Sequence, residues 1–383
     1  MSNQVANVPY CPCVVQAKEE NPSRYPVRTP QGIVPDHLIE KTIGYYSKKG
    51  DMHIVEDFND NANHFSAMRL RRRNRTSSRD TLPDGQIVNI YTAKNRKKLH
   101  KWIVRDGDDA PVHDRSVNEA FNGANQTYLL LKEVYNTNSI DNAHFPLRST
   151  VHYSRNYANA FWDGDEMVYG DGDGKIFNRF TVAIDIPGHE IAHGLTQERC
   201  GTEISSDGKA TGVDYEGEAG GINEGLSDIF GIQVKQRFKG ETAEQSDWLI
   251  GNKLLKTING KTYALRSMTA PGTAFVDHPY LGTDTQVGRY SEYVARDNLE
   301  EVDPHDSSGI VNKAFSHAAI KVGGNTWDKI GKVYFDTMPR LAFSETFEGM
   351  ANKTIKKAQE IFGKGSYEEG AVIEGWKVVE VIK

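Results

Sequence analysis

The residues best suited to chemistry lie in one short stretch, 188–195. His189 and His193 are four residues apart, so in a helix they lie one turn apart on the same face and both imidazoles can reach one metal ion. Imidazole nitrogens suit zinc, and a glutamate directly after the first histidine, here Glu190, is the usual general base of a zinc peptidase. The same pattern also occurs by chance in unrelated chains, so other residues must support it.

A third metal ligand is available downstream, in the segment 221–230. This segment has apolar residues on one side at helical spacing, and it carries Glu224. Glu224 could complete a site of two histidines and one glutamate, with the fourth position left for water. Asp228, one turn further on, is placed to accept the free ring N–H of a ligand histidine and so fix its tautomer.

The elements that position these residues can be read from the pattern of apolar residues. The metal helix is predicted to begin near Thr181, with Pro187 close to its start, where a missing N–H is tolerated. Residues 117–135 have the spacing of a core-facing helix. The acidic, glycine-rich stretch 170–174 lacks the spacing of an EF-hand loop, so we expect a tight turn there. Strands are expected near residues 87–91, 150–154, 159–162 and 166–169.

Composition limits the class of protein. The chain has 383 residues, 38% hydrophobic and 26% charged, which is enough for two lobes and an extension. A net charge of −6 argues against a general nucleic-acid binder, and no apolar run is long enough to span a membrane. The three cysteines, an odd count, cannot form a disulfide framework.

Residues 1–86 differ from the rest of the chain. Their first part is rich in proline, and residues 36–46 then have helical spacing, with Pro35 near the first turn and Gly50 beyond the end. The arginine-rich run from Arg69 to Arg79 has no interleaved aromatic residues, so a solvated, protease-sensitive connector is the better interpretation than a nucleic-acid patch. A mildly basic arm on an acidic body suits a removable or inhibitory segment.

The N-terminus also bears on location. Residues 1–7 are polar and lack the basic and apolar regions of a signal peptide. We therefore expect secretion by a non-classical route, and a cytoplasmic location is the alternative.

Two paired motifs, His189-Glu190-x-x-His193 and Asn223-Glu224-x-x-Ser227-Asp228, resemble those of the thermolysin family of metallopeptidases. The similarity runs from about Val88 to the C-terminus. It implies an α+β fold, with a β-rich lobe over residues 87–182, a helical lobe over 183–383 and the metal helix at the floor of the cleft between them. It also implies that Zn²⁺ is held by His189, His193 and Glu224, with Asp228 and Asn223 supporting the ligand histidines.

The resemblance assigns further catalytic residues. Tyr215 matches the active-site tyrosine of the family, although the gap between the second histidine and Glu224 is longer here by about eleven residues, which we place in 199–213. His305, in the block Pro304–Phe315, matches the catalytic histidine. In the family an acidic residue five positions upstream orients this histidine. The residue at that position here is Glu300.

Substrate-binding residues are implied in the same way. The block beginning Asn159-Ala160 resembles the edge strand that pairs with the substrate backbone, a mode of binding that accepts many sequences. Arg266 corresponds to an arginine that hydrogen-bonds substrate carbonyl groups. The pocket after the scissile bond is apolar here, so cleavage should fall on the N-terminal side of bulky apolar residues; its matching positions are Phe180, Ile186, Ile250, Leu254 and Leu265.

The stretch Ile33–Ile39 resembles the short prosegment motif of protealysin-like peptidases. That resemblance implies a zymogen whose residues 1–86 pack on the catalytic domain and are removed by a cut between Arg69 and Gln86. Cys11 or Cys13 could supply a thiolate to the open position of the zinc, although spare cysteines are the commoner case.

We therefore expect a zinc endopeptidase precursor, monomeric, acting on protein and peptide substrates and inhibited by its own prosegment, with no nucleic-acid or membrane partner. A zinc aminopeptidase would need an anionic anchor for a free α-amine, and the edge-strand block favours internal cleavage. A non-catalytic peptide-binding protein is disfavoured by the intact Glu190. Nucleic-acid binding through the arginine run is the third alternative.

Calcium is a possible second metal. Thermolysin-like enzymes often carry a double calcium site, of which Asp185 and Asp247 are present here, whereas Lys235 and two neutral residues occupy the other positions. Two aspartates and a lysine cannot supply the 6–8 oxygens that a calcium ion needs. We expect the double calcium site to be lost, with the Lys235 ammonium paired to both aspartates instead.

Overall fold

The computed structural model of the chain describes residues 32–61, 87–107, 109–201 and 212–383. Cys11 and Cys13, the proposed cleavage region from Arg69 to Gln86 and most of the insertion at 199–213 lie outside these residues. Where the structure describes the chain, no helix is both long enough and apolar enough to cross a bilayer.

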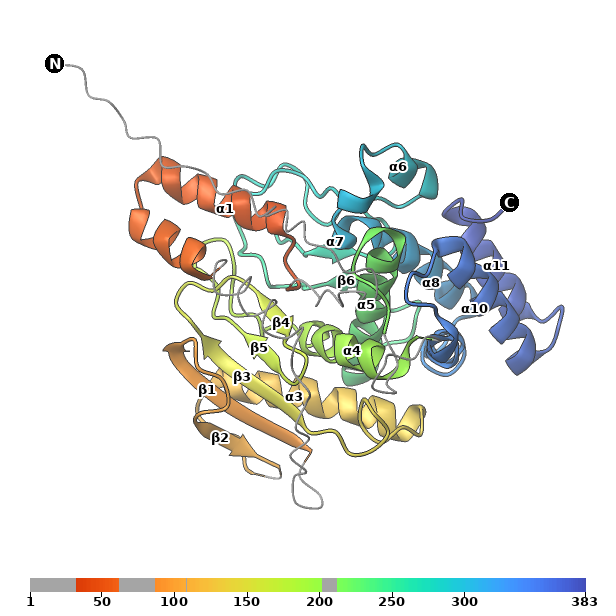
Figure 1. Ribbon diagram of the computed structural model, residues 1–383, viewed down its shortest axis with the longest axis horizontal. Helices are drawn as coiled ribbons and strands as arrows, with labels where there is room; N and C mark the ends of the chain where they lie inside the picture. Colours follow the sequence, from red (N-terminus) through yellow and green to blue (C-terminus); the bar gives the residue numbers. More distant parts are fainter. Residues whose placement is uncertain (1–31, 62–86, 108, 202–211) are drawn as a thin grey trace, which may run out of the picture.

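The N-terminal lobe is built on a five-stranded mixed sheet with the order β2-β1-β3-β5-β4. The central pairs β1–β3 and β3–β5 are parallel, whereas β2 and β4 are antiparallel to their neighbours. Helix α3 lies across one side of the sheet (Figure 1) and ends in a π-helical turn. The elements are β1 (Val88–Arg96), β2 (Ile103–Asp106), α3 (Arg115–Leu129), η1 (Leu130–Val134), β3 (Leu147–Tyr153), β4 (Ala160–Trp162) and β5 (Met167–Tyr169).

Strand β4 forms one edge of this sheet and is fully buried. An edge strand offers unpaired backbone groups on its outer side, and burial of such a strand requires that another segment cover it. Another segment of the chain covers this edge: the backbone N–H of Ile33 bonds to the Ala160 carbonyl, as described below.

Helices α4 (Asp185–Arg199) and α5 (Gly217–Lys239) form the centre of the molecule. They approach closely because Gly231 has no side chain: a Cβ there would lie 2.7 Å from the carbonyl oxygen of Asp185. The prediction that the metal helix begins near Thr181 is wrong by four residues. Turns and bends occupy 180–184, and the helix starts two residues before Pro187, which is compatible with its missing N–H.

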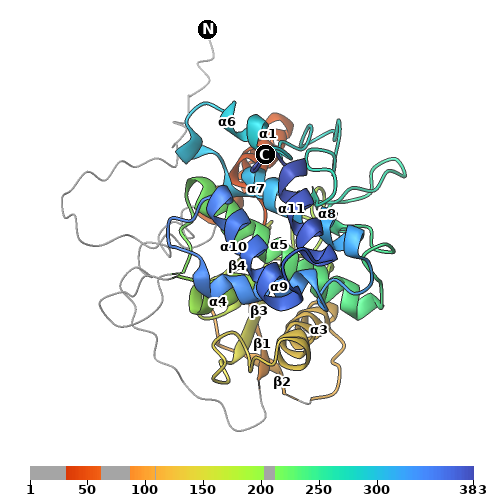
Figure 2. The same ribbon diagram turned by 90° about the vertical axis from the view of Figure 1, so that its right-hand side faces the viewer.

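The C-terminal lobe is helical and packs against α5 on the side away from the sheet (Figure 1, Figure 2). A two-stranded hairpin, β6–β7, is also part of this lobe and carries Arg266. The elements are β6 (Leu249–Ile250), β7 (Arg266–Ser267), α6 (Tyr290–Val294), η2 (Leu299–Glu301), α7 (Pro304–Ser307), α8 (Gly309–Val322), α9 (Ile330–Thr337), η3 (Met338–Arg340), α10 (Phe347–Phe362) and α11 (Tyr367–Val378).

Helix α1 (Asp36–Lys49) lies within the predicted prosegment and touches both lobes. Gly50 ends it with a left-handed backbone, at φ 80°, a conformation that glycine adopts without steric cost. Tyr46 donates a hydrogen bond of 2.9 Å to Asp173 of the N-terminal lobe, and Lys41 donates one of 2.8 Å to the Leu281 carbonyl of the C-terminal lobe. Figure 1 shows α1 lying across the top of the molecule.

Candidate active site

The three predicted metal ligands meet between α4 and α5. The Nε2 atoms of His189 and His193 are 3.1 Å apart, and carboxylate oxygens of Glu224 lie 3.3 and 3.4 Å from them. All three side chains are buried, and together they form a group of donors that could hold one metal ion. The helical spacing of the two histidines is the reason that both reach this point.

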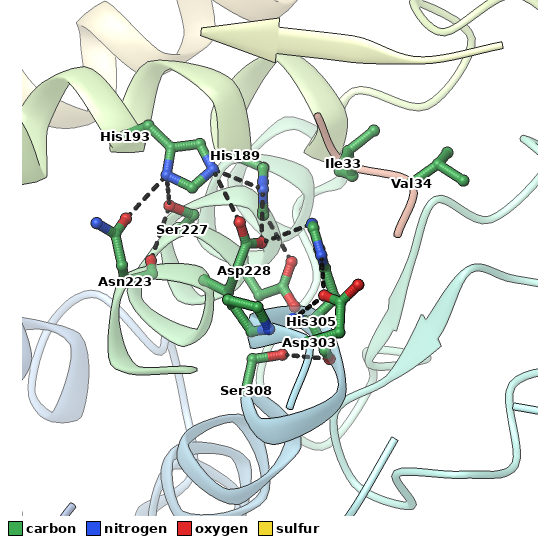
Figure 3. Close-up of polar contacts among 12 residues, drawn as sticks. Ile33, Val34, His189, His193, Asn223, Ser227, Asp228, Asp303, His305 and Ser308 are labelled. Atoms are coloured by element: carbon green, nitrogen blue, oxygen red, sulfur yellow. Dashed lines mark hydrogen bonds and ion pairs between the residues drawn. The ribbon is translucent and has the colours of Figure 1, made fainter. Parts of the chain in front are cut away.

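The other ring nitrogens fix the tautomers of the two histidines. The Nδ1 of His189 lies 2.8 Å from Asp228, and the Nδ1 of His193 lies 2.9 Å from Asn223 Oδ1 (Figure 3). The Asn223 amide group donates in turn to the Val213 carbonyl at 3.0 Å, which turns its oxygen toward His193. Both Nδ1 atoms therefore carry the proton, and both Nε2 lone pairs point toward Glu224.

These donors fit a zinc ion. Two imidazole lone pairs and a carboxylate converge on one point, where they would repel one another without a cation. One carboxylate oxygen of Glu224 is buried and accepts no hydrogen bond from any described residue. Two histidines and one glutamate are a donor set of catalytic zinc. The segment around Glu224 has the apolar face that the sequence indicated, but its polar face lines the site rather than meeting solvent, so that residues 219–236 are all buried.

The electrostatics of the site separate its two glutamates. Burial raises the pKa of Glu190 to about 7, close to neutral pH, where a group can both take up and deliver a proton. Burial also acts to raise the pKa of Glu224, but the positive charge that His305, His193 and His189 carry when protonated outweighs it and holds that pKa well below its usual value. Glu224 is therefore ionised and suited to bind a cation, whereas Glu190 is suited to exchange protons.

His305 faces the same site, with its Nε2 atom 3.3 Å from Glu224. The prediction that Glu300 orients it is wrong. The Nδ1 of His305 lies 2.8 Å from Asp303, and the same carboxylate oxygen caps the backbone N–H of His305 at 2.9 Å. Glu300 lies in η2, a separate turn. Asp303 is better placed because it is the N-cap residue of α7, next to Pro304 at the first helical position.

A sequence signal for Asp303 existed. Aspartate at an N-cap followed by proline is a common start of a helix, and His305 follows directly. The carboxylate of an N-cap residue lies over the first turn of the helix that follows it, so it can reach a side chain two residues later.

Tyr215 also reaches the site, where its hydroxyl donates a hydrogen bond to Glu224. It precedes α5, and its ring is packed edge-on against His193 with 6.3 Å between centroids. Structure and prediction thus place this tyrosine beside the proposed metal ligands.

Arg266 contributes a contact that the sequence did not indicate. Its guanidinium forms a two-pronged ion pair with Asp228, through Nε at 2.8 Å and Nη2 at 2.7 Å. Asn312 donates a further hydrogen bond of 2.8 Å to the same carboxylate. Burial acts to raise the pKa of Asp228, but Arg266 and His189 outweigh it and lower that pKa. Asp228 therefore remains an anion that holds the His189 ring.

A further donor of Arg266 binds the backbone of the predicted prosegment. Its Nη1 atom donates a hydrogen bond of 2.9 Å to the carbonyl of Ile33. The backbone N–H of Ile33 donates to the Ala160 carbonyl at 3.0 Å. The side chain of Asn159 binds both backbone groups of Val34, accepting from its N–H at 3.0 Å and donating to its carbonyl at 3.1 Å. Figure 3 shows Ile33 and Val34 beside the histidines.

A second polar cluster links the same two helices to Asp247. The Lys235 ammonium is 2.5 Å from Asp247 and 3.7 Å from Asp185, and it donates to the Leu249 carbonyl at 2.6 Å. The predicted contact of this lysine with both aspartates is therefore present.

Two helices that bring two histidines and a glutamate together, next to an edge strand that binds the backbone of another segment, define a metallopeptidase. Comparison with known families agrees. Residues 42–197 match the catalytic domain of thermolysin metallopeptidases, and residues 211–381 match their α-helical domain.

The similar proteins include two bacterial proteases of about the same length. The chain is 35% identical to Protease PrtS of Photorhabdus sp. (strain Az29), over 92% of each chain, and 39% identical to an extracellular metalloprotease of Pectobacterium carotovorum subsp. carotovorum, over 83% of this chain and 88% of that one. The protealysin precursor of Serratia proteamaculans has a similar structure, with a TM-score of 0.77 and 36% identity, covering 92% of this chain and all of that one.

The chain belongs to the thermolysin family of metallopeptidases, peptidase family M4. Its fold is the two-lobed α+β fold of that family, and it is a zinc metalloendopeptidase with a His-His-Glu site.

Proposed function

We propose that the protein is a zymogen of a neutral zinc endopeptidase that cuts peptide bonds on the N-terminal side of bulky apolar residues. The observation that supports this best is the binding of residues 33 and 34 by Asn159, Ala160 and Arg266 next to the histidine cluster. The residues inferred to bind substrate therefore already hold a stretch of backbone, which belongs to the proposed prosegment.

The contacts support a proposed role for each residue of the site. His189, His193 and Glu224 hold the metal, and Asp228 and Asn223 keep the two imidazoles in the tautomer that can bind it. When bound, zinc supplies Lewis-acid chemistry for the attack of water on a peptide carbonyl.

Glu190 would take the proton from the attacking water and deliver it to the leaving amine, work for which a pKa of about 7 is suited. His305 and Tyr215 would donate hydrogen bonds to the carbonyl oxygen as it gains negative charge. Burial acts to lower the pKa of His305, but Glu224 and Asp303 outweigh it and raise that pKa, which favours the protonated, donating form. Loss of one such donor typically costs on the order of 10²-fold in rate.

The prosegment in this proposal comprises residues 1–86, and the lobes comprise 87–182 and 183–383. Latency follows from occupancy: while Ile33 and Val34 hold the groups on Asn159, Ala160 and Arg266, no substrate can bind them. We further propose that the protein acts as a monomer on protein and peptide substrates, and that it is secreted by a non-classical route. The name of the Pectobacterium relative supports an extracellular location.

Product mapping tests the specificity. The activated enzyme is incubated with a mixture of peptides, and the new termini are identified by mass spectrometry. Leu, Ile, Val or Phe should dominate the position after the cut, with broad selectivity among them, because one methylene in an apolar pocket changes kcat/KM by only about 10–200-fold. Charged residues at that position in most products would refute the proposal.

A further inference from the structure

We propose that the Gly32–Ile33 peptide bond is a self-cleavage site, hydrolysed by the active site of the same molecule. This inference rests on the proposed endopeptidase function and adds a processing site inside the prosegment, far from the connector that precedes Ile87.

The carbonyl groups indicate which bond is presented for hydrolysis. The Ile33 carbonyl is held by Arg266 and the Val34 carbonyl by Asn159, so neither is free to face the catalytic groups. No described residue donates a hydrogen bond to the Gly32 carbonyl. Of the three consecutive carbonyls at the cleft, that of Gly32 is the one available to His305 and Tyr215.

The nitrogen side of the bond agrees with this assignment. Hydrolysis of Gly32–Ile33 makes the Ile33 nitrogen the leaving group, and the Ala160 carbonyl already accepts its N–H at 3.0 Å. The Val34–Pro35 bond differs in this respect. Its leaving nitrogen belongs to proline and has no N–H, so it cannot donate a hydrogen bond to the strand.

The side chains on either side of the bond fit this position. A Cβ on Gly32 would lie 2.4 Å from the Ala160 carbonyl oxygen and 2.5 Å from Cγ of Asn159. Only glycine allows the backbone to lie this close to β4. Ile33, with no exposed surface, is a bulky apolar residue at the position where the proposed specificity requires one.

The reaction is simple hydrolysis. One water adds across the bond, the C–N bond breaks, Gly32 gains a carboxylate and Ile33 gains an amine. Residues 1–32 leave, whereas the fragment that begins at Ile33 stays bound through Lys41, Tyr46 and the buried face of α1. Full activation would therefore need a second cut in the connector.

The experiment follows the termini of the zinc-loaded, full-length precursor over time by mass spectrometry, in wild type and in Glu190→Gln. We expect a new N-terminus at Ile33 in the wild type only, forming at a rate constant that does not change with protein concentration. An intact Gly32–Ile33 bond in protein whose activated form hydrolyses casein would overturn the proposal and leave the endopeptidase function standing. A protein that cleaves neither would overturn both, and a rate constant that rises with concentration would exclude cleavage within one molecule.

A pair of glycine variants tests the fit directly. Gly32→Ala should slow the cut by about 10–100-fold, because a displacement near 1 Å commonly has an effect of that size. Gly44→Ala, on the open side of α1, is the matched control, since a Cβ there meets no atom within 4 Å; its rate should equal that of the wild type. Equal rates for the two variants would contradict the proposed close fit of Gly32 against β4.

Discussion

Helices α4 and α5 take part in two polar clusters that solve the same electrostatic problem in opposite ways. At one cluster, His189, His193 and Glu224 direct lone pairs and negative charge to one point, and no basic side chain of the described chain fills it. At the other, Asp185 and Asp247 face the ammonium of Lys235. The first cluster is complete only with a metal ion, whereas the second contains its own cation.

The difference shows which residues make a buried site suitable for a metal ion. A buried carboxylate needs a counter-charge, and Lys235 on α5 provides it permanently for Asp185 on α4. Such a lysine would exclude a metal and its chemistry. At the histidine cluster the basic residue, Arg266, binds the outer carboxylate Asp228 instead, so that it supports the ligands without occupying their centre.

Metal chelation should have the largest effect on activity, and it should act on the histidine cluster and not on the Lys235 cluster. EDTA is expected to abolish activity by removing zinc, while a calcium-selective chelator should barely shift the melting temperature, because the Lys235 ammonium already pairs with both aspartates of the second cluster. The measurements are casein hydrolysis and a thermal melt with each chelator. A fall of about ten degrees or more with the calcium-selective chelator, which corresponds to several kcal/mol, would mean that a calcium site exists.

Replacement of the internal cation should cost stability but not chemistry. Lys235→Met leaves Asp185 buried without its partner, and loss of one member of a buried pair costs about 3–5 kcal/mol, less here because Asp247 is partly exposed. Chemical denaturation of the variant measures the loss. The kcat of the folded fraction should stay near that of the wild type; a large fall in kcat at unchanged stability would contradict the structural role of this pair.

The two acidic residues near His305 provide a matched test of the catalytic cluster. Asp303→Asn removes the carboxylate that holds the His305 ring and should lower kcat by about 10–100-fold, in the range of residues that support a catalytic group. Glu300→Gln should leave kcat unchanged. The pH profile of kcat should also move in Asp303→Asn, because Asp303 helps to raise the pKa of His305. The reverse result, with Glu300 as the sensitive position, would restore the assignment made from family resemblance.

Mutation of a third, partly exposed cluster should have the smallest effect, a small loss in the free energy of unfolding. His152 lies 2.8 Å from both Asp114 and Asp171; the hydrogen bond with Asp171 opposes burial and raises its pKa to about 9. Because the pKa is raised in the folded state, the stabilisation is complete below the unfolded value of about 6.5 and is lost as pH rises through 9.

His152→Asn tests this cluster and suits the positive φ at this position. At about pH 6 it should lower the free energy of unfolding by no more than about 1 kcal/mol, with a smaller loss at about pH 10, since exposed pairs are weak. Denaturation at the two pH values gives the comparison. A larger loss at the higher pH would contradict the assigned sign.

Local spacing allowed the metal ligands and their support to be inferred from sequence, because the contacts of His189 and Asp228 follow from residues one turn apart on two helices. The fold class and the lobes came from the resemblance carried by the same motifs. Contacts between distant segments could not be inferred from spacing. Arg266 is 38 residues from Asp228 in sequence, and nothing local to either indicates their ion pair. The error at Glu300 had a similar origin, since a position taken by analogy ignored the N-cap geometry of Asp303.

The most direct test of the central claim compares zinc content and casein hydrolysis between the wild-type chain and Glu190→Ala, both after removal of the prosegment. Glu190 is not one of the three metal ligands, so the variant should retain about one zinc per molecule while losing activity by about 10²–10⁴-fold, the usual contribution of a general base. A variant that hydrolyses casein as fast as the wild type, or a wild-type protein that is active without zinc, would contradict the account.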